Sequence, residues 1–199
     1  MGFLRKSSED GHEAGARGGR LGRRQVLGGA LGIAAGLAGA VVVAGPAAAR
    51  TPSLADQAEW RFCGKCYGLF FRGYGTDGFC PAGNGHDSQG QFNFHIPHDV
   101  PETSSSQRNW RFCDKCLGMY WAGTGYDSSC PIGGSHRRAV DDYDFVLPHD
   151  VSENQSQRNW RFCDKCCGLF YNGRPDNGRC PTGNGHRRAG QYDFVLPYL

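Results

Sequence analysis

The first 49 residues contain neither cysteine nor tryptophan, although the chain of 199 residues has ten cysteines and four tryptophans. This absence excludes thiolate metal ligands from the first part of the chain. Gly, Ala and Arg dominate it instead. The remainder combines all the cysteines and tryptophans with many Gly, Pro, Asn and Ser, a composition typical of short strands and turns rather than helices. The chain therefore divides into a leader and a cysteine-rich part.

The cysteine-rich part, residues 50–199, lacks a net charge. Residues 1–49 carry six of the 22 basic residues and three of the 19 acidic ones, which leaves sixteen of each sign in the rest. The formal charge of +3 therefore comes from the leader. Because non-specific binding to phosphates needs a basic stripe, we expect no nucleic-acid partner.

The chain also lacks a recognisable catalytic motif. No nucleophile elbow, phosphate-binding loop or pair of catalytic carboxylates stands out. His95, His98 and His149 lie outside the repeated pattern described below, and none of them recurs in all three copies. Local hydrogen bonding in a linker explains His98-Asp99 and His149-Asp150 better than a catalytic dyad does. We therefore expect no enzymatic activity, the alternative being an enzyme with an unusual exposed metal site.

The leader has the three parts of an export signal. The pair Arg23-Arg24 precedes a weakly apolar run over residues 27–44, and Ala47-Ala48-Ala49 offers a small-residue cleavage site. We expect residues 1–49 to be a signal peptide, and the mature protein to lie in the cell envelope or outside the cell.

The paired arginines resemble the twin-arginine export signal, although Gly22 stands where that signal usually has Ser or Thr. The resemblance implies a route that carries folded proteins, so a metal could be loaded before export. The alternative is an uncleaved membrane anchor over residues 26–45, which is near the lower length limit for a span. An anchor of this kind is the one contact with a membrane that we expect.

After the leader, one pattern occurs three times at intervals of fifty residues. W-R-F-C-x-K-C begins at Trp60, Trp110 and Trp160, and the spacing is C-x2-C-x13-C-x5-H each time. Three thiolates and one imidazole are the ligand set of a closed, tetrahedral structural zinc site. We therefore predict three zinc ions, one per repeat. The predicted ligands are Cys63, Cys66, Cys80 and His86; Cys113, Cys116, Cys130 and His136; and Cys163, Cys166, Cys180 and His186.

Each repeat has the pattern of a small sheet. A strand-forming triplet follows the C-x2-C pair, and an aromatic run closed by proline ends the repeat. About forty residues bury too little apolar area to fold without a metal, disulfides or neighbours. We predict a small all-β, metal-stapled fold of three tandem zinc-ribbon-like repeats, the alternative being one compact pseudo-threefold β body. The predicted segments are the signal peptide 1–49, linker 50–59, repeat one 60–97, linker 98–109, repeat two 110–148, linker 149–159 and repeat three 160–199.

Glycine follows the C-x2-C pair by two positions in every repeat, as Gly68, Gly118 and Gly168. A metal-binding knuckle often needs a positive φ, which glycine adopts without steric cost. We therefore expect these glycines to supply it.

The motif W-R-F-C-x-K-C-x-G, followed by C-P-x-G-x-x-H, resembles tandem repeats in exported, mostly uncharacterised proteins of high-GC bacteria. The resemblance covers residues 60–199 and is to a zinc ribbon, in which two knuckles on two hairpins clamp one ion. The C-x5-H pair departs from the usual second C-x2-C and implies a wider second knuckle. The resemblance implies an accessory role in the envelope or outside the cell, with no known reaction.

A disulfide framework is the main alternative to zinc, because exported proteins meet oxidising conditions. Three cysteines cannot pair within one repeat, although Cys167 makes the total even, and a histidine at fixed distance has no role in a disulfide scheme. Iron in place of zinc is a second alternative. A redox-active C-x2-C pair is a third, but the sequence has no βαβ pattern around it.

Aromatic side chains are the best indication of a ligand. One face of each small sheet must be core, whereas the other could stack on sugar rings or pack against a neighbour. The candidate ligand-binding residues are Trp60, Phe71, Trp110, Trp121, Trp160 and Tyr171. We expect an exported, non-enzymatic, multivalent binding or scaffolding protein that contacts carbohydrate or a cell-envelope protein. The alternatives are an enzyme and a disulfide-stabilised, lectin-like secreted protein.

Overall fold

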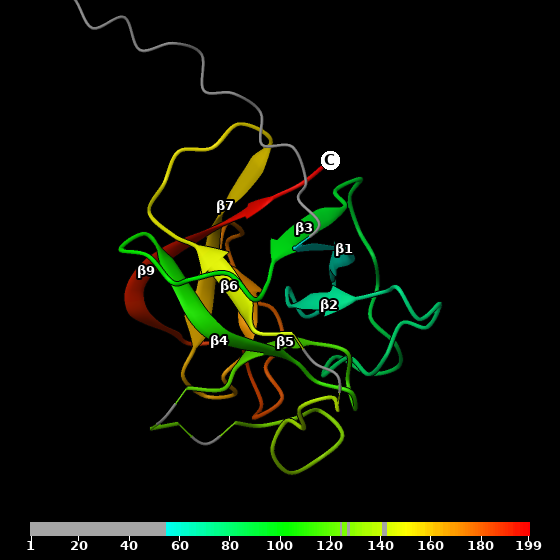
Figure 1. The fold of residues 1–199 in the computed structure, drawn as a ribbon. Coiled ribbons are helices and arrows are strands. Elements are labelled where there is room, and N and C mark those ends of the chain that lie inside the picture. The colour runs from blue at the N-terminus through cyan, green and yellow to red at the C-terminus, as the bar shows by residue number, and fades with distance from the viewer. Residues whose placement is uncertain (1–54, 124, 127, 141–142) are drawn as a thin grey trace, which may run out of the picture. The chain divides into compact units, whose positions relative to one another are not determined.

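The computed structural model describes residues 55–123, 125–126, 128–140 and 143–199, so the predicted signal peptide lies outside the described residues. The described residues form nine β-strands and no helix (Figure 1). Consequently, none of these residues belongs to a helix long and apolar enough to cross a membrane. The all-β fold predicted from the sequence is confirmed.

Each repeat contributes one three-stranded antiparallel sheet with its first strand in the middle. The central strand is the longest of the three in repeats one and two, and the outer strands pair with opposite edges of it. The strands are β1 (Asp56–Phe62), β2 (Leu69–Phe71) and β3 (Phe94–Pro97); β4 (Ser106–Phe112), β5 (Met119–Trp121) and β6 (Phe145–Pro148); and β7 (Ser156–Cys163), β8 (Leu169–Tyr171) and β9 (Arg188–Pro197).

The central strands begin earlier than the sequence predicts. They start four residues before the repeated tryptophans, at Asp56, Ser106 and Ser156, inside the segments predicted as linkers. In two copies those segments read Q-R-N before the tryptophan, and they pair with β6 and β9. From Asp56, Ser106 and Ser156 onward, the segments predicted as linkers are parts of the sheets.

The register places the repeated tryptophan at the centre of each sheet. Trp60 lies opposite Phe71 of β2 and Phe94 of β3, and the register shifts between Gln57 and Trp60. At this irregularity Glu59 has a φ of 68°, and the equivalent Asn109 and Asn159 have 67° and 68°. The bulge turns the tryptophan side chain into the core.

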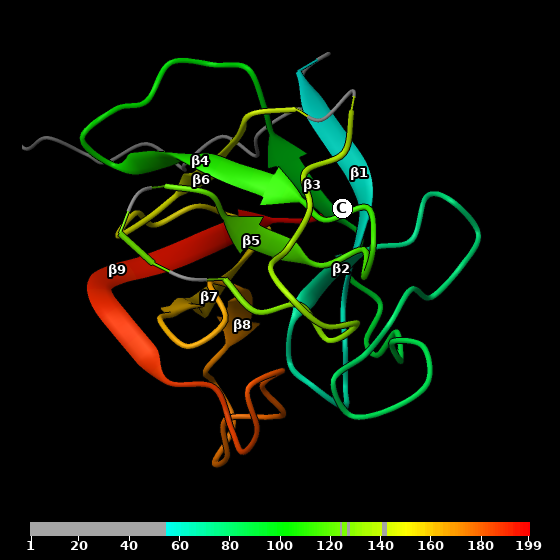
Figure 2. The ribbon, with the colours of Figure 1, turned by 90° about the horizontal axis from the view of Figure 1, so that it is seen from below.

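The three sheets pack against one another in a closed ring. Strands β2, β5 and β8 contact each other in all three combinations, and so do β3, β6 and β9 (Figure 2). Isolated β-bridges close the first ring, namely Phe70 with Gly118, Tyr120 with Gly168, and Phe170 with Gly68. Residues 55–199 thus form one pseudo-threefold β body, which is the alternative architecture that the sequence allowed.

Stacked rings close the second set of strands. His98 stacks on Tyr143 with ring centroids 3.7 Å apart, and His149 stacks on Tyr192 at the same distance. At the third boundary Tyr198 stacks on Phe92 at 3.9 Å. Tyr198 therefore takes the position that His98 and His149 have at the other two boundaries, since each of the three supplies a ring for the stack.

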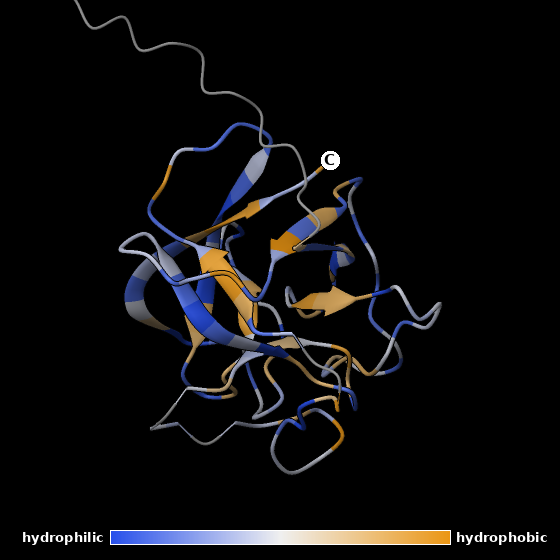
Figure 3. Cartoon of the chain, in the orientation of Figure 1, coloured by the Kyte–Doolittle hydropathy of each residue, from blue (hydrophilic) through white to orange (hydrophobic). Residues whose placement is uncertain are grey.

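A single core fills the space between the sheets. Trp60, Trp110 and Trp160 are 0% exposed, and each meets a phenylalanine from another repeat edge-to-face. Hydrophobic residues run along β2, β3 and β6, and these strands contribute side chains to the core (Figure 3). Because each tryptophan packs against a neighbouring repeat, no repeat has a complete core of its own.

Candidate metal centres

Two tight turns present the cysteine and histidine side chains of each repeat. In repeat one, the turn after β1 carries Cys63 and Cys66, and the amide of Tyr67 donates to the carbonyl of Cys63 at 2.9 Å. The loop between β2 and β3 carries Cys80 and His86, and the amide of Cys80 donates to a carbonyl four residues on at 2.9 Å. The two turns are the two knuckles that the zinc-ribbon resemblance implies.

The structure brings each predicted ligand set together. In every repeat one donor atom from each of the four residues lies within 4.8 Å of the other three. All nine cysteine ligands are buried, together with His86 and His186, and His136 is half-buried. The three groups are Cys63, Cys66, Cys80 and His86; Cys113, Cys116, Cys130 and His136; and Cys163, Cys166, Cys180 and His186. Each group could hold one metal ion.

The distances between donor atoms match a tetrahedral zinc site. With Zn–S bonds of about 2.3 Å and Zn–N bonds of about 2.0–2.1 Å, tetrahedral angles separate two sulfurs by about 3.8 Å and a sulfur from a nitrogen by about 3.6 Å. The Cys63 and Cys80 sulfurs are 3.8 Å apart. The sulfur of Cys66 lies 3.5 Å from Nδ1 of His86, and the equivalent distances in the other repeats are both 3.6 Å. The donor set therefore fits a zinc ion.

No disulfide joins any of the ten cysteines. Cys167 is buried like the others, at 1% exposure, but it belongs to none of the three groups. The structure thus shows three thiol–imidazole clusters rather than a disulfide framework.

Backbone amides point at the sulfurs. The amides of Gly68 and Asp87 donate to Cys66 and Cys63, each at 3.4 Å, and the amide of Ala82 donates to Cys80 at 3.4 Å. Amide donors stabilise thiolates, which are the form in which cysteine binds a metal.

The clustered thiols shift each other's pKa strongly. Hydrogen bonding from Cys116 lowers the pKa of Cys113 to about 3 and the pKa of Cys130 to about 5. The same contacts with Cys113 and Cys130, together with burial, raise the pKa of Cys116. Burial alone would lower the pKa of His86, but hydrogen bonds with Cys63 and Cys80 raise it to about 9. Each cluster thus concentrates negative charge on sulfur, which favours a bound cation.

The positive φ of the first knuckle lies one residue before the predicted glycine. Tyr67 has a φ of 66°, and the equivalent Leu117 and Cys167 have 65° and 61°. The expectation for Gly68 is therefore wrong. A Cβ on Gly68 would lie 3.4 Å from the sulfur of Cys66, which is close to ordinary van der Waals contact, and the structure gives no steric reason for glycine there.

A lysine clamps the two knuckles together. Nζ of Lys65 donates to the carbonyls of Gly83 and Gly85 at 2.8 and 2.6 Å, and Lys165 makes the same two bonds in repeat three. Lys115 donates to the carbonyl of Gly133 at 2.8 Å. The repeated lysine is therefore a structural partner of the second knuckle, a role that its position beside the cysteines did not reveal.

An aromatic ring holds each histidine ligand in place. Phe70 stacks on His86 with centroids 4.5 Å apart and planes 15° from parallel. Tyr120 and Phe170 stack in the same way on His136 and His186, both at 4.7 Å. The middle residue of each strand triplet after the first knuckle therefore packs against the candidate metal centre.

The three centres surround one small cavity of about 40 Å³. Side chains of all three groups line it, including Cys66, Cys116 and Cys166. A hydrogen bond crosses between repeats here, because Nε2 of His186 lies 3.2 Å from the carbonyl oxygen of Cys66. The centres are therefore parts of one assembly.

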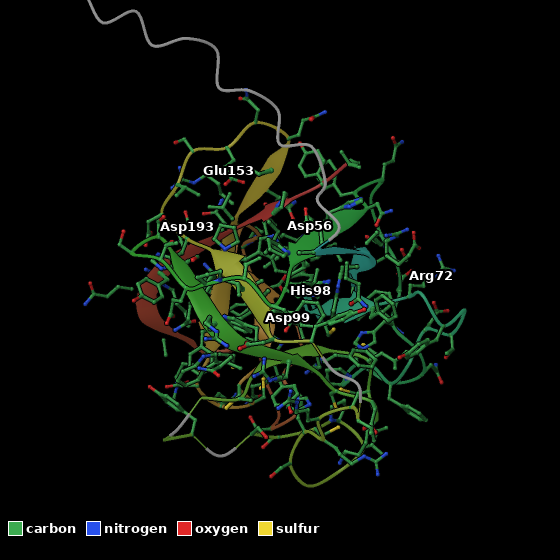
Figure 4. All side chains as sticks on the ribbon, viewed as in Figure 1. Asp56, Arg72, His98, Asp99, Glu153 and Asp193 are labelled. Atoms are coloured by element: carbon green, nitrogen blue, oxygen red, sulfur yellow. The ribbon has the colours of Figure 1, made fainter. Side chains whose placement is uncertain are left out.

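The histidine–aspartate pairs lie away from the metal centres. Nδ1 of His98 is 2.9 Å from Asp99 (Figure 4). Nδ1 of His149 is likewise 2.9 Å from Asp150. The second carboxylate oxygen of Asp99 accepts the amide of Asp144 in the next repeat. These pairs join repeats, in line with the interpretation as local hydrogen bonding.

The candidate ligand-binding aromatics separate into two groups. Trp60, Trp110 and Trp160 are fully buried, where no ligand reaches their rings, so they are core residues and not contact residues. The other three, Phe71, Trp121 and Tyr171, end β2, β5 and β8 and each line a cleft between two repeats.

Comparison of the chain with protein-family models, with curated proteins and with solved structures finds no match. The assignment of the three candidate metal centres therefore depends on the residues of this chain and their geometry.

Proposed function

We propose that each Cys3His group holds a zinc ion and that the protein is an exported, non-enzymatic, multivalent binding protein. The observation that carries the proposal is the spacing of donor atoms, which fits one tetrahedral zinc ion in each of three equivalent, buried groups. Three thiolates and an imidazole suit zinc, and iron is an alternative metal for such soft ligands.

A structural role for the metal follows from the number of ligands. Catalytic zinc keeps an open coordination position for water or substrate, whereas each group here offers four protein ligands. Their burial leaves little access for a substrate, which supports a binding protein over an enzyme. The metals would hold together sheets of three short strands whose core is shared between repeats.

Export is proposed from the leader, which lies outside the described residues. A twin-arginine-type route would deliver the protein folded, with its thiols already bound to zinc and protected from oxidation. Such a protein would work in the envelope or outside the cell, where carbohydrate and surface proteins are the available partners.

Multivalency is proposed from the threefold repetition. Three copies of one surface on one body convert weak single contacts into tighter overall binding when the target itself repeats. A polysaccharide or an arrayed surface protein is a target of that kind.

Native mass spectrometry of the mature protein, with and without a chelator, tests the metal assignment. We expect three zinc ions per chain and loss of the folded charge-state distribution when they are removed. A metal-free mass lower by paired hydrogens would show disulfides and refute the assignment, and bound iron would correct the metal.

Two cysteine variants sharpen this test. Cys130→Ser removes one ligand from the repeat-two group and should leave two tightly held zinc ions. Cys167→Ser alters a buried cysteine outside the three groups and should keep three. Equal zinc content in the two variants would contradict the ligand assignment.

A further inference from the structure

Three clefts lie at the three boundaries between repeats, and equivalent residues line them. The cleft between repeats two and three has a volume of about 410 Å³. The cleft between repeats three and one has about 380 Å³, and the cleft between repeats one and two has about 140 Å³. Only the first two reach the size of typical small-molecule sites.

Aromatic rings from both repeats form the walls of the largest cleft. Trp121 and Tyr126 come from repeat two, and Phe162 and Tyr192 come from repeat three. The ring centroids of Trp121 and Tyr126 lie 5.6 and 5.1 Å from that of Phe162. Tyr126 is 48% exposed and Tyr192, one face of which is covered by His149, is 41% exposed, so part of each side chain is accessible to a ligand.

Hydrogen bonds hold the wall and the floor of this cleft in place. The indole nitrogen of Trp121 donates to the carbonyl of Arg108 at 3.2 Å. Oε1 of Gln107, which also lines the cleft, accepts the indole nitrogen of Trp110 at 3.1 Å. Because its oxygen is engaged, the amide of Gln107 offers its NH2 group as a fixed donor. A pre-organised site of this kind loses little entropy on binding.

The lining of this cleft is neutral. Among the described residues that form it, the polar side chains are two glutamines and two tyrosines, and no side chain is charged. A charged ligand would find no partner here, and a purely apolar ligand would leave the amides unpaired.

We propose that the cleft between repeats two and three binds a pyranose ring of a neutral glycan. The proposal rests on the multivalent binding function proposed above and names its ligand class. The C–H face of a pyranose packs on Trp121 or Tyr126, and its hydroxyls pair with the amides of Gln107 and Gln191 and with the tyrosine hydroxyls.

The other two clefts are unequal copies of this one. At the boundary of repeats three and one, Arg174 takes the place of the loop tyrosine and lies 5.1 Å over the ring of Phe62. At the boundary of repeats one and two, Tyr74 lies 5.8 Å from Phe112 and the cleft is narrow. We therefore place the strongest site between repeats two and three.

Tryptophan fluorescence reports on this cleft specifically. The chain has four tryptophans, and three of them are fully buried. Trp121 is the one that is partly exposed, so a small quencher such as acrylamide reaches it first. A sugar that occupies the cleft should protect it.

The experiment measures acrylamide quenching of the zinc-loaded mature protein with neutral trisaccharides of N-acetylglucosamine, glucose or mannose, and with a galacturonic acid trisaccharide as the charged control. We expect at least one neutral sugar to protect Trp121 in a saturable way. Tyr126→Ala should weaken binding by about twofold to tenfold, and Trp121→Phe should remove the signal. Tyr74→Ala, the matched change in the narrow cleft, should leave it unchanged.

The outcomes separate this inference from the proposed function. Protection by the acidic sugar alone, or by no sugar at all, overturns the pyranose assignment. If the protein binds cell-wall material and Tyr126→Ala does not weaken that binding, the cleft is not the binding site. The proposed multivalent binding function would then still hold. If the protein holds three zinc ions but binds no such material, the proposed function is refuted as well.

Discussion

Nε2 of His186 in repeat three donates to the carbonyl oxygen of Cys66 in repeat one, across 3.2 Å. The amide of Arg179 donates to the same carbonyl at 3.3 Å, and the amides of Phe79 and Ser129 make the equivalent bonds to Cys116 and Cys166. The second knuckle of each repeat is therefore bonded to the first knuckle of another. The geometry of each candidate metal centre is therefore coupled to the packing between repeats.

One consequence is that a single repeat should not fold alone. We expect a peptide of residues 55–99 to bind one zinc ion but to lack a stable sheet, because its Trp60 packs against Phe112 and Phe145 of another repeat. Proton–nitrogen correlation spectra with zinc would show poor amide dispersion for the peptide and wide dispersion for residues 55–199. A well-dispersed spectrum from the peptide would show instead that each repeat is an independent zinc ribbon.

The metal centres could be predicted from the sequence because metal ligation demands particular residue types at a fixed spacing. The same C-x2-C-x13-C-x5-H pattern occurs in three copies, and a disulfide framework gives no role to His86 and its equivalents. The all-β class followed from short aromatic runs between turn residues.

The packing between repeats could not be predicted, because it depends on contacts between residues far apart in the sequence. The sequence pattern is the same whether Trp60 contacts a ligand or lies in the core. Only its register with Phe71 and Phe94 distinguishes these two roles. The left-handed residue Tyr67 was missed because glycine was the expected choice for that conformation. Its neighbour Gly68 instead donates its backbone amide to the sulfur of Cys66.

The carboxylate beside the repeated arginine changes position between repeats. In repeat one, Arg61 bonds to the carboxylate of Glu59 at 2.9 Å and to the amide oxygen of Asn93. In repeat two the acid and the amide are exchanged, so that Asn109 stands in place of Glu59 and Asp144 in place of Asn93. Each arginine thus keeps one carboxylate, from either of two positions.

This exchange predicts a compensating pair of mutations. Asp144→Asn should lower the free energy of unfolding by about 2 kcal/mol, because Arg111 is 8% exposed and its bond to a charged acceptor is lost. Asn109→Glu added to it should restore about 0.5–1 kcal/mol, since the new carboxylate is more exposed. Urea unfolding of the zinc-loaded proteins measures both. If Asn109→Glu stabilises the wild type as much as it stabilises Asp144→Asn, the two positions do not share one arginine.

The pKa of Asp144 determines the pH range over which its carboxylate stabilises the protein. Burial alone would raise the pKa of Asp144, but hydrogen bonds from Arg111 and Arg108 and the amide of Asn109 lower it below the ordinary value of 3.8. A carboxyl with a lowered folded-state pKa stabilises the protein fully above its ordinary pKa, and this stability is lost as the pH falls through the folded-state value.

The stability difference between wild type and Asp144→Asn should therefore stay constant from about pH 8 to about pH 5 and shrink only below about pH 4. Any acid destabilisation common to both proteins in the upper range would come from other groups, the metal centres among them. Urea midpoints in a pH series provide the measurement. A difference that already shrinks between about pH 8 and about pH 5 would place the titrating group elsewhere.

The lysine clamp should slow metal loss. Lys165 bonds the carbonyls of Gly183 and Gly185 at 2.7 and 3.0 Å, so Lys165→Met frees the second knuckle. We expect zinc release from this centre to a chelator to become about tenfold faster. Arg187→Met is the matched control, because it removes a nearby cation whose ion pair with Asp164 is exposed. Equal acceleration in both variants would attribute the effect to charge and not to the clamp.

The position of the Trp121 ring depends on a glycine two residues later. A Cβ on Gly123 would lie 1.9 Å from Cζ2 of Trp121, so Gly123→Ala must displace the indole ring from its place in the cleft. We expect red-shifted emission, stronger acrylamide quenching and a loss of about 1–3 kcal/mol in unfolding free energy. Gly173→Ala makes the same change beside Tyr171 at another boundary, where a Cβ would lie 2.2 Å from the hydroxyl oxygen. That control should cost stability without altering the quenching of Trp121, because its cleft lies between repeats three and one. Unchanged quenching in Gly123→Ala would mean that the ring can settle elsewhere in the cleft, and the glycine would then have no part in shaping the site.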